Sequence, residues 1–260
     1  RDPKANWPTP VALASGMATV EPERVSITWG TGGAAKVLEA LFAASFRIRK
    51  PYGLIELPGA YGPGGPPAPA LGVALQTALK RTFLQHGKST TKCGAPKPVT
   101  LSIDDQSLTF TVQGYSTFVH QRAWKDVVKA QTRGVTKLAS WVYPGATERH
   151  IAYPSTKWSY TFGQALSGCF ALVGCVSYGV PRSGGGAMVI LEPSDLVRFA
   201  VTRGRLTPGR LADAYVTGAG DAVLAVQLAM RMDKSVRDRP GVASAQGVLL
   251  RSTPWAKQQK

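Results

Sequence analysis

The sequence predicts an α+β protein in which irregular mixed sheets with hairpins pack against several helices. Three observations lead to this prediction. Apolar residues recur at helical spacing in 34–46, 70–86 and 221–232. Apolar and polar residues alternate in 25–29 and 99–104, which is the period of a half-buried strand. Helical and strand patterns follow one another without the regular alternation of a βαβ fold.

The amino-terminal part divides into a lead-in and the start of the domain. Residues 1–23 hold four prolines and little periodicity, so they are expected to be an extended lead-in. Residues 24–260 are expected to form one α+β nucleic-acid-binding domain, part of a longer chain. Within it we expect a strand at 25–29, a turn at 30–33, a helix at 34–46, a short strand at 54–57 and a loop at 62–67.

The strongest helical pattern lies at 70–86, with apolar residues at four-residue spacing and Gly87 in position to end the helix. A hairpin follows, with strands at 99–104 and 108–112. Further expected elements are a helix at 123–132, strands at 136–143 and 187–191, a helix capped by Ser194 and Asp195 that runs to 201, and a helix at 221–232. The apolar stretch 165–180 carries three glycines, two serines and two cysteines, so we expect buried strand and turn there and no membrane span.

The charge balance is the clearest functional signal. The chain has 31 Lys and Arg against 15 Asp and Glu, a net charge of +16 and a pI near 10.1. Such a basic protein usually binds a polyanion, because neutralising phosphates releases counterions. The cations are dispersed along the chain, which favours a folded surface that follows a nucleic-acid backbone over a disordered basic arm.

The three cysteines, Cys93, Cys169 and Cys175, cannot all pair within one chain. No secretory signal precedes them, so we expect free thiols in a reducing, cytoplasmic setting. Neither their spacing nor that of the histidines suits a zinc site, and no metal or cofactor is expected.

Two glycine-rich segments suggest chemistry that the sequence does not support further. Gly218 to Asp221 resembles the anion hole and base of sugar kinases, but the other signatures of those enzymes are missing. A glycine turn with Asp221 near a helix start is favoured. Ser183 to Gly186 leads into a strand, so a flexible hairpin turn is favoured over a phosphate loop.

All three histidines occur in the same kind of segment. Each has a cation within two residues and an aromatic residue close by, and two sit next to a glutamine. Gln and Arg can read base edges, and Lys and Arg can hold phosphates. For each histidine a structural role, such as capping a helix end, is the alternative. The segments are 83–88, 118–122 and 143–150.

Several ordered segments together resemble the large subunit of type I CRISPR surveillance complexes (Cascade), in particular the Myxan subtype grouped with type I-B. The resemblance covers about residues 24–232 and the carboxy-terminal tail. The segments that carry it are 26–29, 54–58, 82–88, 104–105, 119–122, 141–146, 149–150, 172–178, 189–196 and 254–260.

The resemblance implies a non-enzymatic subunit that recognises a protospacer-adjacent motif on duplex DNA and supports strand opening and R-loop formation by a guide RNA. Its implied partners are the guide RNA, target double-stranded DNA and the backbone and foot subunits. A helicase-nuclease or transposition proteins would act afterwards, and no membrane is involved.

The chemistry of the residues suggests where such contacts lie. We expect the histidine segments to form a DNA-facing surface, and no residue is assigned a catalytic role. The alternatives are a histidine-dependent RNA-processing endonuclease and a basic structural subunit of a ribonucleoprotein. The candidate nucleic-acid-binding residues are Gln85, His86, Lys88, Lys92, His120, Gln121 and Arg122. Arg149, His150 and Lys157 are the candidates for contact with the nucleic-acid backbone.

Overall fold

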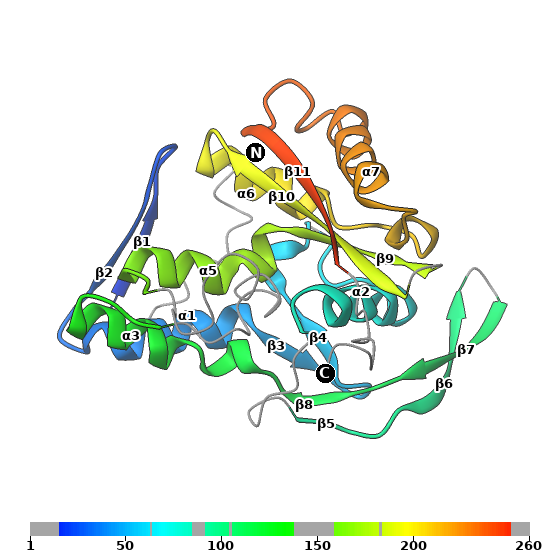
Figure 1. Ribbon diagram of the computed structural model, residues 1–260, viewed down its shortest axis with the longest axis horizontal. Helices are drawn as coiled ribbons and strands as arrows, with labels where there is room; N and C mark the ends of the chain where they lie inside the picture. Colours follow the sequence, from blue (N-terminus) through cyan, green and yellow to red (C-terminus); the bar gives the residue numbers. More distant parts are fainter. Residues whose placement is uncertain are drawn as a thin grey trace, which may run out of the picture.

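The computed structural model describes residues 16–62, 64–84, 92–103, 106–137, 159–181 and 184–250. It confirms the α+β class, with helices packed around several small antiparallel sheets (Figure 1). The helices are α1 (Gly33–Ser45), α2 (Pro69–Thr82), α3 (Trp124–Arg133), α5 (Phe162–Gly174), α6 (Leu196–Arg205) and α7 (Ala219–Met232), with short 3₁₀ turns η2 (Pro58–Ala60), η3 (Val119–Arg122) and η5 (Ala212–Ala214).

The strands pair as hairpins and one larger sheet. The pairs are β1 (Gly16–Val20) with β2 (Val25–Trp29), β3 (Arg47–Arg49) with β4 (Leu54–Glu56), β5 (Lys92–Cys93) with β8 (Tyr115–Thr117), and β6 (Lys97–Ile103) with β7 (Gln106–Val112). The larger sheet has the order β11 (Val242–Leu250), β10 (Gly185–Pro193), β9 (Val176–Val180), all antiparallel.

Helices cover both faces of the three-stranded sheet. One face packs on α7, where Val226 lies in a cluster with Val176 and Val189. The other face meets α2, where the Thr82 and Ser177 hydroxyls lie 3.2 Å apart in the interior. Gly186 permits this approach, because a Cβ there would lie 2.8 Å from the Thr82 methyl carbon. The three-stranded sheet from the carboxy-terminal part of the chain therefore lies between α7 and the earlier helix α2, in a helix–sheet–helix sandwich.

A second core lies between α1, α3 and α5. Phe42 and Phe46, four residues apart on α1 and its end, make edge-on ring contacts at 5.4 Å. Phe170 from α5 lies 5.3 Å from Phe42, and Phe118 lies 6.2 Å from Phe46. These aromatic side chains anchor α5 and the η3 turn to α1.

The apolar stretch 165–180 is mostly helix, so the expectation of strand and turn was wrong for its first part. Helix α5 runs to Gly174, and only 176–180 form a strand. A short apolar run fits a buried helix as well as a strand. The deciding signal lies just before it: Thr161 and Gln164 form a capping box, with the Thr161 hydroxyl and the Gln164 side chain each accepting from the other residue's amide.

Other expected elements differ mainly in length. Helix α2 ends at Thr82 and not at His86, whereas α6 continues to Arg205. Of the expected strand at 136–143, the structure shows a bridge between Thr136 and Tyr160; 138–143 lie outside the described residues. Residues 16–20, within the expected lead-in, form β1. Strand β11 was not anticipated, since alanine, serine and glycine dilute its pattern.

One buried cation connects these parts. Arg203 on α6 is 6% exposed, and its guanidinium donates to the carbonyls of Val173, at 2.6 Å, and Cys175, at 2.8 Å. These carbonyls end α5, where unpaired acceptors and the helix dipole favour a cation. The same group donates to Thr207 Oγ1 at 2.9 Å and to the Ala60 carbonyl of η2 at 3.4 Å. Arg203 therefore joins α5, α6, η2 and the start of β9.

We expect Arg203→Ala to lower the free energy of unfolding by about 3 kcal/mol, because several buried carbonyls are deprived of a charged donor at once. Urea unfolding measures this. The matched control is Arg210→Ala, whose side chain is 83% exposed and pairs with Asp213; the urea midpoint of this variant should equal that of the wild-type protein. Equal effects of the two substitutions would contradict the role given to Arg203.

Candidate nucleic-acid interface

A continuous run of elements carries cations along one edge of the protein. The chain passes from the β6–β7 hairpin through β8 and η3 into α3, with β5 alongside β8, and these elements follow one another along the lower edge of Figure 1. Six Lys and Arg side chains on these elements are exposed. We call these six residues the basic edge: Lys92, Lys97, Arg122, Lys125, Lys129 and Arg133.

The α3 part of the basic edge is an amphipathic helix. Val127 and Ala130 face the core and are 0% and 1% exposed. Lys125, Lys129 and Arg133 recur at four-residue spacing, so they share the outer side. The single carboxylate of this helix, Asp126, accepts from Lys129 at 2.8 Å. The outer side of α3 therefore keeps a net positive charge.

A hydrogen-bonded ladder fixes the other end of the edge to α2. The buried Gln76 side chain accepts from the Ile55 amide and donates to the Gln113 carbonyl, both at 2.8 Å. Gln113 accepts from Lys80 and donates to Cys93 Sγ at 3.1 Å. Because β5 and β4 are tied to the same helix, Lys92 projects from a rigid support.

Among the histidines, His120 lies within the described residues, and its burial does not support the predicted contact with nucleic acid. Its side chain is 0% exposed and lies between Phe46 and Phe118, with ring centroids 5.5 and 6.0 Å away. Burial lowers its pKa to about 3, because the charged imidazolium is disfavoured there. The η3 turn directs this side chain inward, which the local sequence did not reveal.

Gln121 also has a structural role. Its side-chain oxygen accepts from the Phe118 amide at 3.1 Å, and its Nε2 donates to the Phe46 carbonyl at 3.2 Å. These bonds tie η3 to the end of α1, so the predicted base contact by Gln121 is not supported. The next residue, Arg122, is exposed and stays a candidate, as does Lys92.

The remaining candidates lie outside the described residues: Gln85, His86, Lys88, Arg149, His150 and Lys157. Their assignment stays a prediction.

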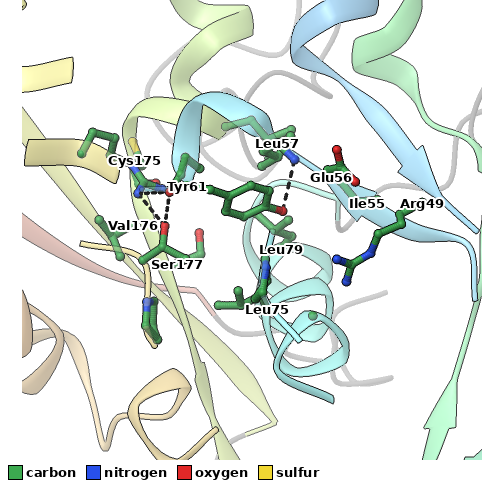
Figure 2. Close-up of a pocket in the computed structure, with 17 residues that line it drawn as sticks. Arg49, Ile55, Glu56, Leu57, Tyr61, Leu75, Leu79, Cys175, Val176 and Ser177 are labelled. Carbon is green, nitrogen blue, oxygen red and sulfur yellow. Dashed lines mark hydrogen bonds between the residues drawn. The ribbon is translucent and has the colours of Figure 1, made fainter. Parts of the chain in front are cut away.

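A cavity between β4, η2, α2 and β9 has a structural character (Figure 2). Tyr61 lies across it, with its hydroxyl accepting from the Leu57 amide at 3.2 Å. Burial raises the pKa of Tyr61 and brings that of Cys175 to about 11, so both stay neutral near pH 7. The volume of about 40 Å³ holds a few water molecules and is far below the roughly 300–1,000 Å³ of ligand pockets.

The other motifs agree with their structural interpretations. Asp221 accepts from the Thr217 amide at 2.8 Å and its hydroxyl at 3.2 Å, closing the turn before α7. Gly184, with φ of +63°, lies in the turn between β9 and β10. Cys169 and Cys175 are buried free thiols and Cys93 is exposed. Within the described ranges, no cluster of His, Cys, Asp or Glu could hold a metal ion. None of the helices in these ranges combines the length and the apolar character that a membrane span needs.

In the sequence, Lys125, Lys129 and Arg133 belong to the dispersed cations and to no predicted contact segment. Their spacing after Arg122 was the available signal, since steps of three and four residues place side chains on one helix face. Because α3 is a helix, these three cations lie together on its outer side.

Comparison with known proteins identifies the family. Residues 3–169 match the DevT N-terminal domain. The chain is also 51% identical over 260 residues to the CRISPR-associated protein Cas8a1/Csx13 of Myxococcus xanthus (strain DK1622). This alignment covers 99% of the chain and 45% of that relative, so the chain spans about half of the relative's length. The chain belongs to the DevT N-terminal domain family.

The burial of His120 predicts a pH dependence of stability. Its pKa is about 3 in the folded protein and about 6.5 in the unfolded chain. Between these values the unfolded state binds more protons, so stability is full above pH 6.5 and falls as the pH drops. From pH 7 to pH 5 this costs about 2 kcal/mol.

Urea unfolding at both pH values tests this against His120→Leu, which fills a similar volume and does not titrate. The wild-type protein should be destabilised by about 2 kcal/mol more than the variant on going from pH 7 to pH 5. Parallel decreases in the two proteins would place His120 in contact with water.

Proposed function

We propose that the chain forms part of the large subunit of a type I CRISPR Cascade complex of the I-B-like, Myxan subtype. In this role it binds duplex DNA, recognises the protospacer-adjacent motif and supports strand opening and R-loop formation by the guide RNA. The observation that carries the proposal is the similarity of almost the whole chain to a CRISPR-associated protein. The setting would be the cytoplasm, with guide RNA, target DNA and other Cascade subunits as partners.

The charge distribution supports nucleic-acid binding by the basic edge. From residue 47 to residue 137 the sequence holds thirteen Lys and Arg against four Asp and Glu, which accounts for +9 of the net +16. Lys and Arg on a rigid surface hold phosphates and set the register of a duplex. Arg122, at the junction of η3 and α3, and Arg133, at the end of α3, carry the guanidinium group that can make a bidentate contact with guanine.

We also propose that the subunit is not an enzyme and acts without a cofactor. An RNA-cleaving site would need histidines that exchange protons near neutral pH. His120 is enclosed by aromatic rings and has a pKa of about 3, so it does not suit this task. Incubation of the chain with labelled guide RNA tests the point: we expect intact RNA after hours, and specific cleavage fragments would restore the endonuclease alternative.

Removing charge from the basic edge should weaken DNA binding. We expect the triple variant Arg122→Gln, Lys125→Gln, Arg133→Gln to bind target duplex at least about tenfold more weakly at physiological salt. The slope of log K against log salt should become shallower by about 0.9 for each phosphate that the variant no longer neutralises. Binding of the guide-RNA complex to labelled duplex, titrated at several salt concentrations, gives both quantities.

The matched control removes three exposed arginines that already pair with carboxylates: Arg24→Gln, Arg198→Gln and Arg210→Gln, the partners of Glu21, Asp195 and Asp213. This variant should bind as the wild-type complex does. Equally weakened binding by both triple variants would show that net charge, and not the basic edge, drives binding. Binding that ignores both guide sequence and flanking motif would contradict the proposed recognition role.

A further inference from the structure

Helix α7 is almost wholly apolar although it lies at the surface of the protein. Of its fourteen residues, Asp221, Gln227 and Arg231 are the ones with polar side chains. A helix that is apolar all round is normally buried on all sides. The inner face of α7 is buried, with Ala222 and Val226 both 0% exposed against the sheet. Its outer face is largely apolar as well and lies at the surface (Figure 1).

The exposed side chains form a line. Leu224 is 50% exposed, Leu228 47% and Met232 81%. They recur every four residues, so they lie along one side of the helix over about 12 Å. We call these three residues the α7 stripe. Within the described residues, every large apolar side chain that is both helical and exposed belongs to it.

Other surface helices show what an outer face bound only by water looks like. The exposed positions of α3 are Lys125, Lys129, Gln131, Thr132 and Arg133, and those of α6 are Arg198 and Arg205. In both of these helices the chain places polar groups where the helix meets solvent. A row of apolar side chains in contact with water indicates a surface that is covered in use.

The charges beside the stripe define what covers it. Asp221 lies in the first turn of α7, Arg231 in its last turn and Lys234 just after it, all exposed; Asp233 between the two cations is less exposed and pairs with Arg205. Arg231 follows Asp221 by ten positions, which is about 15 Å along the helix. A helix that runs antiparallel to α7 would bring its first turn to Arg231 and Lys234 and its last turn to Asp221. Acidic residues in a first turn and basic residues in a last turn are what the helix dipole favours.

We propose that the α7 stripe docks an antiparallel amphipathic helix of another subunit of the CRISPR complex, with an acidic first turn and leucine-sized side chains at i and i+4. This rests on the proposed function, which places the chain in such an assembly. The apolar stripe supplies the contact, and the charges at its two ends fix the direction of the partner helix.

Thiol footprinting of the assembled complex tests the proposal. The chain carries Cys93→Ser, which removes the exposed native thiol, together with Leu228→Cys; Cys169 and Cys175 are buried. The rate of reaction with a maleimide is measured in the chain alone and in the purified guide-RNA complex. We expect it to fall at least tenfold on assembly. The control is Val25→Cys on β2, at a side chain of similar exposure (51%), where we expect a smaller change.

Charge insertion gives an independent measurement. Leu224→Glu or Leu228→Glu should reduce incorporation of the chain into the complex at least tenfold in competition with wild type. Gln227→Glu adds the same charge on the same helix and should leave incorporation unchanged. Since residues 224 and 228 are half-exposed, all three variants should keep the wild-type melting temperature of the chain alone.

The outcomes distinguish a failure of the docking proposal from a failure of the proposed function. A complex that assembles and binds target DNA while the thiol of the Leu228→Cys variant stays reactive overturns the docking site and leaves the proposed function intact. Slow reaction in the chain alone also overturns it: a rate that depends on protein concentration indicates a second copy, and a constant rate indicates cover within the same chain. If the chain does not co-purify with guide RNA at all, both proposals fail.

Discussion

The arrangement of the two cores depends on the hydrogen bonds that the buried guanidinium of Arg203 donates. Within the described residues Arg203 is the one charged side chain in the interior, and its partners are carbonyl oxygens and a hydroxyl, with no carboxylate among them. Burial lowers its pKa to about 10, so it still carries its charge near pH 7. Placing a cation in the interior is costly unless several acceptors converge on it. Here the end of α5, the η2 turn and α6 must all be in place together.

Helix α5 connects the Arg203 site to the part of the protein that carries α3. Its carboxyl end meets Arg203, while Phe170 in the same helix packs on α1 beside the rings that enclose His120. The η3 turn holds this position through Gln121, whose side chain bonds the end of α1. Helix α3 follows η3 directly. Its outer cations therefore project from a support that α1, α5 and η3 hold in place. A surface that recognises a duplex benefits from such rigidity, because phosphate contacts set register only if the cations keep their spacing.

The two exposed surfaces differ in chemistry. The basic edge is polar, dispersed and suited to a solvated polyanion, whereas the α7 stripe is apolar, short and bordered by opposite charges. They also belong to different cores: the first lies on the α1–α3–α5 cluster and the adjoining hairpins, the second on the three-stranded sheet. Such a division fits the proposed role, in which the chain contacts both nucleic acid and protein, since charge-rich and apolar contacts are favoured by different surroundings.

The class of fold, the existence of most helices and the strongly basic character follow from the sequence alone. Periodicity and net charge are local or additive properties, so they can be read without knowing the fold: α7 and α3 were placed within two residues, and +16 needs no structure. Tertiary structure decided what depends on distant partners. It put His120 inside an aromatic cage, gave Gln121 to the backbone of α1, made 162–174 a helix through packing and its cap, and joined Arg203 to carbonyls 28 to 143 residues away. Such contacts leave no local pattern, because the residues that meet are separated by whole elements of the chain.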